Sequence, residues 1–232
     1  MDYTTLTSAK TVPGSIANWM NDSTIVAQTP TIVTESQDWI YRKLRHWRMI
    51  PPPITGSMST SALTQAIPSD MLEPDFFLIT GIYRRILYQK TFEEVMAAWA
   101  YDGNGVLIPQ QPAIYAFDST NFSFDSVPDK AYPYALRYFQ QPAPLSSGNN
   151  TNFLTNFCAR LFRTVLTMMA CEWTKEVAQG QFDRTYWEQQ AEAELQRVQI
   201  ESDRSKRAVT GGWIQGAMAG EAGGPGWVGY PG

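Results

Sequence analysis

The chain is poor in the residues that carry most metal and nucleophilic chemistry, because its 232 residues include one histidine and two cysteines. A structural zinc site needs four cysteine or histidine ligands at short spacings, and none stands near His46 in the sequence. No Gly-x-Ser-x-Gly segment and no G-x-x-x-x-G-K-S/T phosphate loop is present. We therefore expect no cofactor, no metal ion, no serine hydrolase and no P-loop ATPase, and we expect His46 to lie on the surface.

The chain also lacks an excess of positive charge and a long uninterrupted apolar run. Its 18 basic and 22 acidic residues give a formal net charge of -4, so no overall attraction to nucleic acid is expected. The most apolar stretch, 152–173, contains Asn156, Arg160 and Arg163, which lipid does not tolerate without partners. The first ten residues have an acid at position 2 and no apolar core, so neither secretion nor membrane insertion is predicted.

Both cysteines, Cys158 and Cys171, lie in this apolar stretch, which is typical of a core helix. A helix would separate them by about 20 Å, far beyond the reach of a disulfide. We expect two reduced thiols and a cytoplasmic origin.

Apolar spacing and capping residues predict five helices. Ser15 and the Thr91–Glu94 capping box mark two helix starts, while the Pro51–Pro53 run and Gly180 mark helix ends. The expected helices cover about 15–21, 31–48, 91–101, 152–179 and 183–207.

Branched and aromatic residues predict strands in two segments, about 72–90 and 112–140, and the small polar residues of 57–68 predict a surface loop. The expected fold class is mainly α: a helical bundle with an inserted small antiparallel β region. This domain covers 1–207, and an extended glycine-rich C-terminal arm covers 208–232.

The arm combines flexibility with large apolar groups. Nine of the sixteen glycines fall within the last 23 residues, which leaves the backbone free to follow another surface. Its apolar side chains are expected to anchor it to a partner or to a neighbouring subunit: Trp213, Ile214, Met218, Trp227 and Tyr230. The alternative is a tail that only keeps the C-terminus soluble.

The segment RKLRHWR places three arginines near the end of the second expected helix: Arg42, Arg45 and Arg48. Bases beside Trp47 suggest a nucleic-acid patch, but the spacing assigns Trp47 to the buried stripe. A subunit interface or a solvated helix face is the better interpretation.

Paired carboxylates offer the one enzymatic alternative. Glu172 and Glu176 share a helix face, and a glycan hydrolase needs only two carboxyl groups at a suitable separation. Nothing in their surroundings indicates a raised pKa, so solvated side chains are the simpler interpretation. A small DNA-binding helical protein is a third alternative, which the acidic balance disfavours.

The order of seven segments resembles the head-to-tail adaptor proteins of tailed double-stranded-DNA bacteriophages. The resemblance spans about residues 10 to 205 and ends before the glycine-rich arm. It is carried by SIANWMNDSTI, DWIYRKLRHWRMI, AIPSDML, ILYQKTFEEV, PAIYAFDSTNFSFDSVPD, YALRYFQQPAPLS and TNFLTNF.

The resemblance implies a structural, non-enzymatic protein of the virion neck. Such proteins form a ring, generally of twelve copies, beneath the portal, after DNA packaging in the host cytoplasm. The ring extends the DNA channel without sequence-specific binding and presents an attachment surface for the tail. The implied partners are the portal protein and a downstream tail or nozzle protein.

Overall fold

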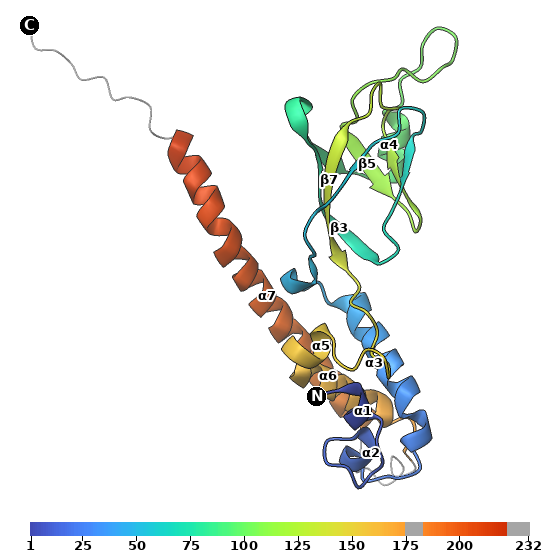
Figure 1. Cartoon of the computed structure of the whole chain (residues 1–232), viewed down its shortest axis with the longest axis vertical. Coiled ribbons are helices and arrows are strands. Elements are labelled where there is room, and N and C mark those ends of the chain that lie inside the picture. Colours follow the sequence, from blue (N-terminus) through green and yellow to red (C-terminus); the bar gives the residue numbers. More distant parts are fainter. Residues whose placement is uncertain (175–182, 222–232) are drawn as a thin grey trace, which may run out of the picture. The chain divides into compact units, whose positions relative to one another are not determined.

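The computed structural model describes residues 1–174 and 183–221, apart from the side chains of Tyr83 and of 206–221. The chain divides into two compact units (Figure 1). The helical unit consists of Met1–Arg48 and Ala143–Gly232, and the sheet unit consists of Met49–Pro142. The sheet unit is therefore an insertion between two parts of the helical unit.

The helical unit is built from short capped helices and three longer ones. Asp2, Ser15 and Asn152 each cap a helix by accepting backbone N–H groups, as N-cap residues do. The elements are α1 (Tyr3–Leu6), α2 (Ile16–Trp19), the 3-10 turn η1 (Val26–Gln28), α3 (Thr29–Lys43), α5 (Phe153–Phe157), α6 (Ala159–Ala170) and α7 (Arg184–Glu221). The 3-10 turn η2 (Trp47–Met49) leads into the sheet unit.

The core of the helical unit lies around α6, which packs against both α3 and α7. Apolar residues recur along α6 at helical spacing, and most of them are buried. Each fully buried Leu, Ile or Phe contributes about 1.5–3 kcal/mol to the free energy of unfolding. The buried set includes Ile32, Val33 and Ile40 of α3, Leu161, Phe162, Val165 and Leu166 of α6, and Ala191 and Leu195 of α7.

The sheet unit contains one curled sheet of seven strands in the order β1-β7-β3-β4-β5-β6-β2. All neighbouring pairs are antiparallel except β4 and β5, which are parallel. The unit also contains η3 (Gly81–Tyr83) and α4 (Phe92–Ala97). The strands are β1 (Ile54–Ser57), β2 (Thr64–Ala66), β3 (Met71–Ile79), β4 (Arg85–Gln89), β5 (Ile114–Phe117), β6 (Asn121–Phe124) and β7 (Pro133–Gln140).

Aromatic rings pack together in the core of the sheet unit. Phe77 stands in the middle, with its ring centroid 5.1–5.9 Å from four other rings in edge-to-face arrangements. Those four rings belong to Tyr115, Phe122, Phe124 and Tyr134. The sheet unit therefore has an apolar core of its own.

The mainly α prediction was wrong. The fold is mixed, with a seven-stranded sheet in place of a small antiparallel insertion. The loop expected at 57–68 contains β2 and the end of β1, whose residues are largely exposed and show no apolar alternation. Their strand conformation depends on pairing with β6 and β7, which local patterning does not reveal.

Several helix ends also differ from the expected ones. Helix α3 ends at Lys43, because Leu44 is extended and its buried side chain turns into the core. The helix expected over 152–179 is broken at Cys158 into α5 and α6, and 175–179 lie outside the described residues. Helix α7 continues past Arg207, where the extended arm was expected, to Glu221. Extending an established helix needs no new nucleation, so the four glycines of its C-terminal part, Gly211, Gly212, Gly216 and Gly220, do not stop it.

Candidate functional site

Helix α7 presents two different faces along its described side chains. One face is buried in the helical unit through Ala191, Leu195 and Ser202. Glu194 fixes this packing by an ion pair with Arg160 of α6, 2.8 Å between Nη2 and Oε1. The 38 residues of α7 span about 57 Å, and its C-terminal part runs on past α5 and α6 (Figure 1).

The opposite face of α7 carries exposed apolar side chains at a seven-residue spacing, which is two helical turns. Tyr186 is 53% exposed and Ile200 is 52% exposed, with the exposed Ala193 midway between them. Glutamines 189 and 196 lie between these residues and line shallow depressions on the same face. We call Tyr186, Ala193 and Ile200 the α7 seam, and it has the spacing of a helix–helix contact.

Arg42 lies in an open groove of about 440 Å³ between α3, α6 and the start of α7. Three cations and three carboxylates line this groove together with Trp39 and Met169: Arg42, Lys43, Arg184, Glu35, Asp38 and Glu172. Among the described residues the charges of this groove therefore balance, so they give no basis for a phosphate-binding patch.

Arg45 and Arg48 do not share a surface with Arg42. The guanidinium of Arg45 donates to the carbonyl oxygens of Tyr41 and Leu44, at 2.8 and 3.1 Å. The guanidinium of Arg48 stacks over the ring of Phe157, 4.3 Å from its centroid. Arg45 thus secures the end of α3, whereas Arg42 and Arg48 remain exposed.

The expectation that His46 lies on the surface was wrong, because the side chain is 7% exposed. Its ring lies 5.1 Å from that of Phe153, and its Nδ1 accepts the backbone N–H of Arg48 at 3.2 Å. Burial and then the nearby Arg48 lower the pKa of His46, so the neutral ring is favoured. His46 is a packing residue that orders the chain between α3 and η2.

The residues expected to anchor the arm fall in two places. Trp213, Ile214 and Met218 belong to the C-terminal part of α7, in a stretch whose side chains are not described. Trp227 and Tyr230 lie outside the described residues. The contacts that these five residues make therefore stay a prediction.

The carboxylate pair considered for hydrolysis is not assembled by the described residues. Glu172 is bound to the guanidinium of Arg184, while Glu176 lies outside the described part of the chain. Glu94 completes the predicted capping box with Thr91, and hydrogen bonds to Thr91 and Lys90 lower its pKa. Within residues 1–174 and 183–205, no group of three His, Cys, Asp or Glu could hold a metal ion.

The sequence reasoning missed an exposed apolar surface on the sheet unit. Ile82 is 90% exposed, Tyr88 is 63% exposed, and Phe92 and Met96 of α4 are also exposed. The signal was present in the segment RILYQ, where consecutive apolar residues must place apolar groups on both faces of a strand. In contrast Tyr132 is buried, and its hydroxyl donates to Asp129 Oδ1 at 2.7 Å.

Comparison with known proteins gives one family match. The model of the family described as SU10 adaptor protein matches residues 7–212, which covers most of the chain. No curated protein matches the sequence. Among the described helices, none combines the length and apolar character that a membrane span requires.

Proposed function

The chain belongs to the SU10 adaptor protein family, a family of phage head-to-tail adaptors, and from this premise we propose that its copies form a ring beneath the portal. The family gives the chain a structural role in the virion neck, between portal and tail proteins. The proposed ring contains twelve copies, extends the DNA channel and offers the attachment surface for the tail. It assembles in the host cytoplasm after DNA packaging, and its mechanism is geometric and not catalytic.

The two-faced character of α7 is the observation that carries the ring proposal. One face of the helix is buried within the helical unit, while the seam of Tyr186, Ala193 and Ile200 is exposed to solvent. Exposed apolar groups at a seven-residue spacing suit the packing of a second helix. In a ring, that helix comes from the next copy, and the exposed Arg42 and Arg48, which lie on separate surfaces, are proposed to contact neighbouring copies as well.

The C-terminal residues supply the proposed attachment to the portal or to a neighbouring copy. A helix of this length carries its C-terminal residues away from the core of the helical unit. Trp213, Ile214, Met218, Trp227 and Tyr230 then act as anchors, and the multiplicity of copies adds avidity without high affinity for each.

The ring is tested by native mass spectrometry of the protein bound to its portal. We expect many copies per portal, and one or two copies would refute the ring. Ile200→Arg should lower the copy number, because a charge in the seam opposes helix packing. Asn156→Arg adds the same charge at an exposed position of α5 and should leave the number unchanged.

The attachment is tested by truncation after Arg207. The shortened chain should stay folded by circular dichroism but be washed from portal-bearing particles more readily than the full chain. Trp213→Ala and Trp227→Ala should each reproduce part of that loss. Equal retention of the full and truncated chains would refute the attachment and leave the ring proposal standing.

A further inference from the structure

One face of the sheet unit forms an apolar groove flanked by arginines. Leu78 of β3 pairs with Ile86 of β4, while their neighbours Phe77 and Leu87 point into the core. The strand alternation therefore sends Leu78 and Ile86 to the opposite, outer face. The groove has a volume of about 440 Å³ and is lined by Phe76, Leu78, Arg84, Arg85, Ile86 and Tyr88.

The two groove arginines have no ion pair within the described residues, and both are exposed. Ile86 and Tyr88 are 44% and 63% exposed. Aromatic and branched residues rimmed by arginine are typical of surfaces that bind another protein.

A second apolar surface of the sheet unit consists of α4 and the hairpin that follows it. Phe92 and Met96 are 47% and 44% exposed and lie one helical turn apart. The hairpin adds Tyr101, Val106 and Ile108, at 54%, 61% and 42% exposure. We call these five residues the ridge.

The ridge is ordered in advance by its own hydrogen bonds. Asp102 accepts the backbone N–H groups of Asn104 and Val106 at 2.8 and 2.9 Å, and Gly105 has the positive φ of 76° that the turn requires. The capping box of Thr91 and Glu94 fixes the start of α4. A preformed surface loses little conformational entropy on binding.

The charges beside the ridge are opposite to those beside the groove. Glu93 and Asp102 are exposed on the ridge, whereas Glu94 is paired with Lys90 at 3.0 Å. Among the described residues, no carboxylate lines the groove that holds Arg84 and Arg85. Glu93 likewise forms no ion pair with a described residue, since Lys90 pairs with Glu94.

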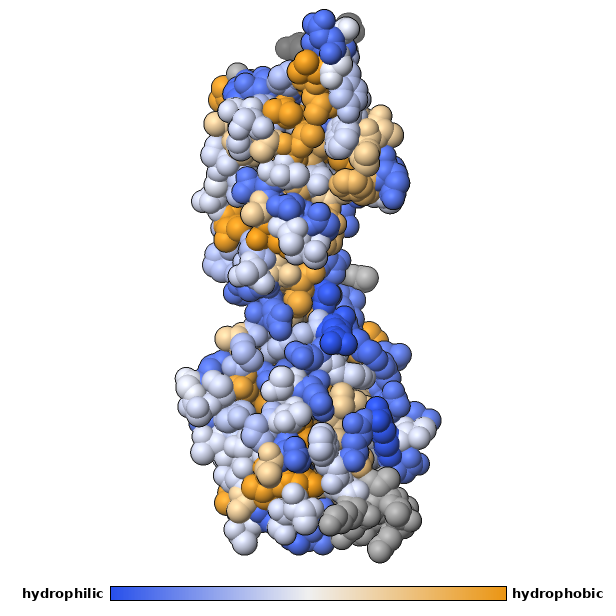
Figure 2. Space-filling view, turned by 90° about the vertical axis from the view of Figure 1, so that its right-hand side faces the viewer, coloured by the Kyte–Doolittle hydropathy of each residue, from blue (hydrophilic) through white to orange (hydrophobic). Residues whose placement is uncertain are grey.

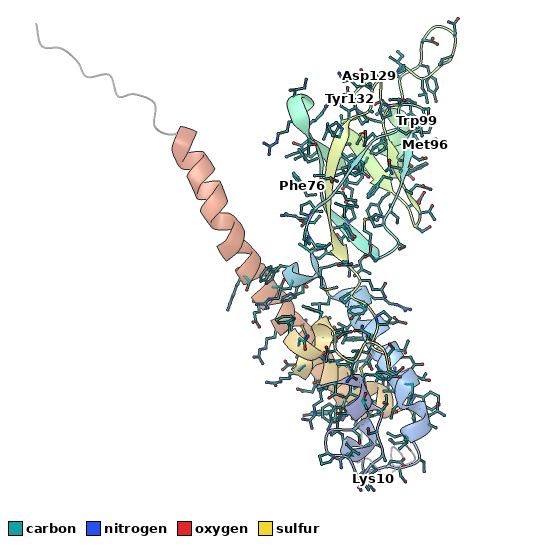
Figure 3. The ribbon with its side chains drawn as sticks, viewed as in Figure 1. Lys10, Phe76, Met96, Trp99, Asp129 and Tyr132 are labelled. Carbon is teal, nitrogen blue, oxygen red and sulfur yellow. The ribbon has the colours of Figure 1, made fainter. Side chains whose placement is uncertain are left out.

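The two surfaces lie on different sides of the sheet unit. Figure 3 shows Phe76 of the groove at one side of the sheet and Met96 with Trp99 at the other. Figure 2 looks at the side that carries Met96, and apolar residues gather there over the sheet unit. Two complementary surfaces on different sides give a head-to-tail contact, which closes into a ring or extends into a filament.

We infer that the ridge of one copy binds in the groove of the next copy, with Phe92 and Met96 against Ile86 and Tyr88. Arg84 and Arg85 then face Glu93 and Asp102. This inference rests on the proposed ring and names a second contact that closes it, through the sheet units in addition to the α7 seam.

Cross-linking between two single-cysteine variants of the full chain tests the contact. Tyr88→Cys labels the groove and Met96→Cys labels the ridge, while both natural cysteines are buried. A short bis-maleimide is added on portal-bearing particles that retain the protein. A mixture of the two variants should give cross-linked dimers, and either variant alone should give at most a tenth of that yield.

Charge variants then test the pairing. Arg84→Glu with Arg85→Glu in the Tyr88→Cys chain should lower the dimer yield about tenfold, and Glu93→Arg in the partner should restore part of it. The control Lys10→Glu in the helical unit (Figure 3) should leave the yield unchanged.

Equal dimer yields from Tyr88→Cys alone and from the mixture would overturn the head-to-tail contact in favour of a symmetric one. No dimers on particles that retain the protein would show that another partner covers these surfaces, with the adaptor role intact. Failure of the unmodified chain to bind portal-bearing particles would instead refute the proposed function.

Discussion

Replacing Asn152 by alanine should destabilise the helical unit strongly, because this one buried side chain joins two helices, α5 and α3. Its Oδ1 accepts the N–H groups of Leu154 and Thr155 at the start of α5, at 3.0 and 3.4 Å. Its Nδ2 donates to Gln37 Oε1 and Tyr41 Oη of α3, at 3.0 and 3.1 Å. The side chain thus ties α5 to α3 at the point where the chain returns from the sheet unit.

The magnitude follows from two losses. Removing an N-cap costs about 1 kcal/mol, and leaving buried polar partners unsatisfied costs about 1–3 kcal/mol more. We expect Asn152→Ala to lower the free energy of unfolding by about 2–4 kcal/mol. At a urea slope of about 2 kcal/mol per molar, the midpoint falls by about 1–2 M.

Urea unfolding followed by circular dichroism at the helical band measures this loss. Asn156→Ala is the matched control: the same substitution in the same helix, at an exposed side chain without a hydrogen bond in the described structure. The control should change stability by less than about 0.5 kcal/mol. Equal midpoints for the two variants would refute the reasoning from the buried network.

Three further predictions concern His46, Gly56 and the two cysteines. Burial lowers the folded-state pKa of His46 below its ordinary 6.5. The neutral ring therefore contributes its full stability above pH 6.5, and this contribution declines as the pH falls through the folded-state pKa. His46→Gln should therefore flatten the urea midpoint against pH on the acid side of 6.5, and an unaltered profile would contradict this. Gly56→Ala should lower the free energy of unfolding by about 1–3 kcal/mol, because the added methyl group would meet Tyr134 Oη at 2.6 Å. The control Gly103→Ala has open space and should change stability little. In a Tyr134→Ala background the Gly56→Ala effect should be smaller, as measured by thermal unfolding. Burial raises the pKa of the Cys158 thiol to about 12 and that of Cys171 to about 11. Both thiols should resist iodoacetamide at pH 8 in the native protein and react in urea, as read by mass spectrometry; rapid native labelling would contradict their burial.

Local signals determined several helix starts in both units in advance. Ser15 and the Thr91–Glu94 box begin helices as predicted, because a capping interaction involves residues only three positions apart. The resemblance to phage adaptors also came from sequence order alone, and the family match agrees with it. The free state of Cys158 and Cys171 followed from their spacing on helical sequence.

The tertiary structure decided what local spacing cannot encode. Strands β1 and β2 exist because β7 and β6 offer them unpaired backbone groups. Helix α3 ends at Lys43 because Leu44 turns into the core and the Gln199 side chain of α7 hydrogen-bonds to the backbone of Arg45. The same holds for the surfaces: only the strand pairing shows that Ile86 and Tyr88 face outward, and only helix packing shows which side of α7 is left for a partner. Capping and apolar periodicity act within one or two turns of chain, whereas sheet edges and exposed faces depend on residues tens of positions away.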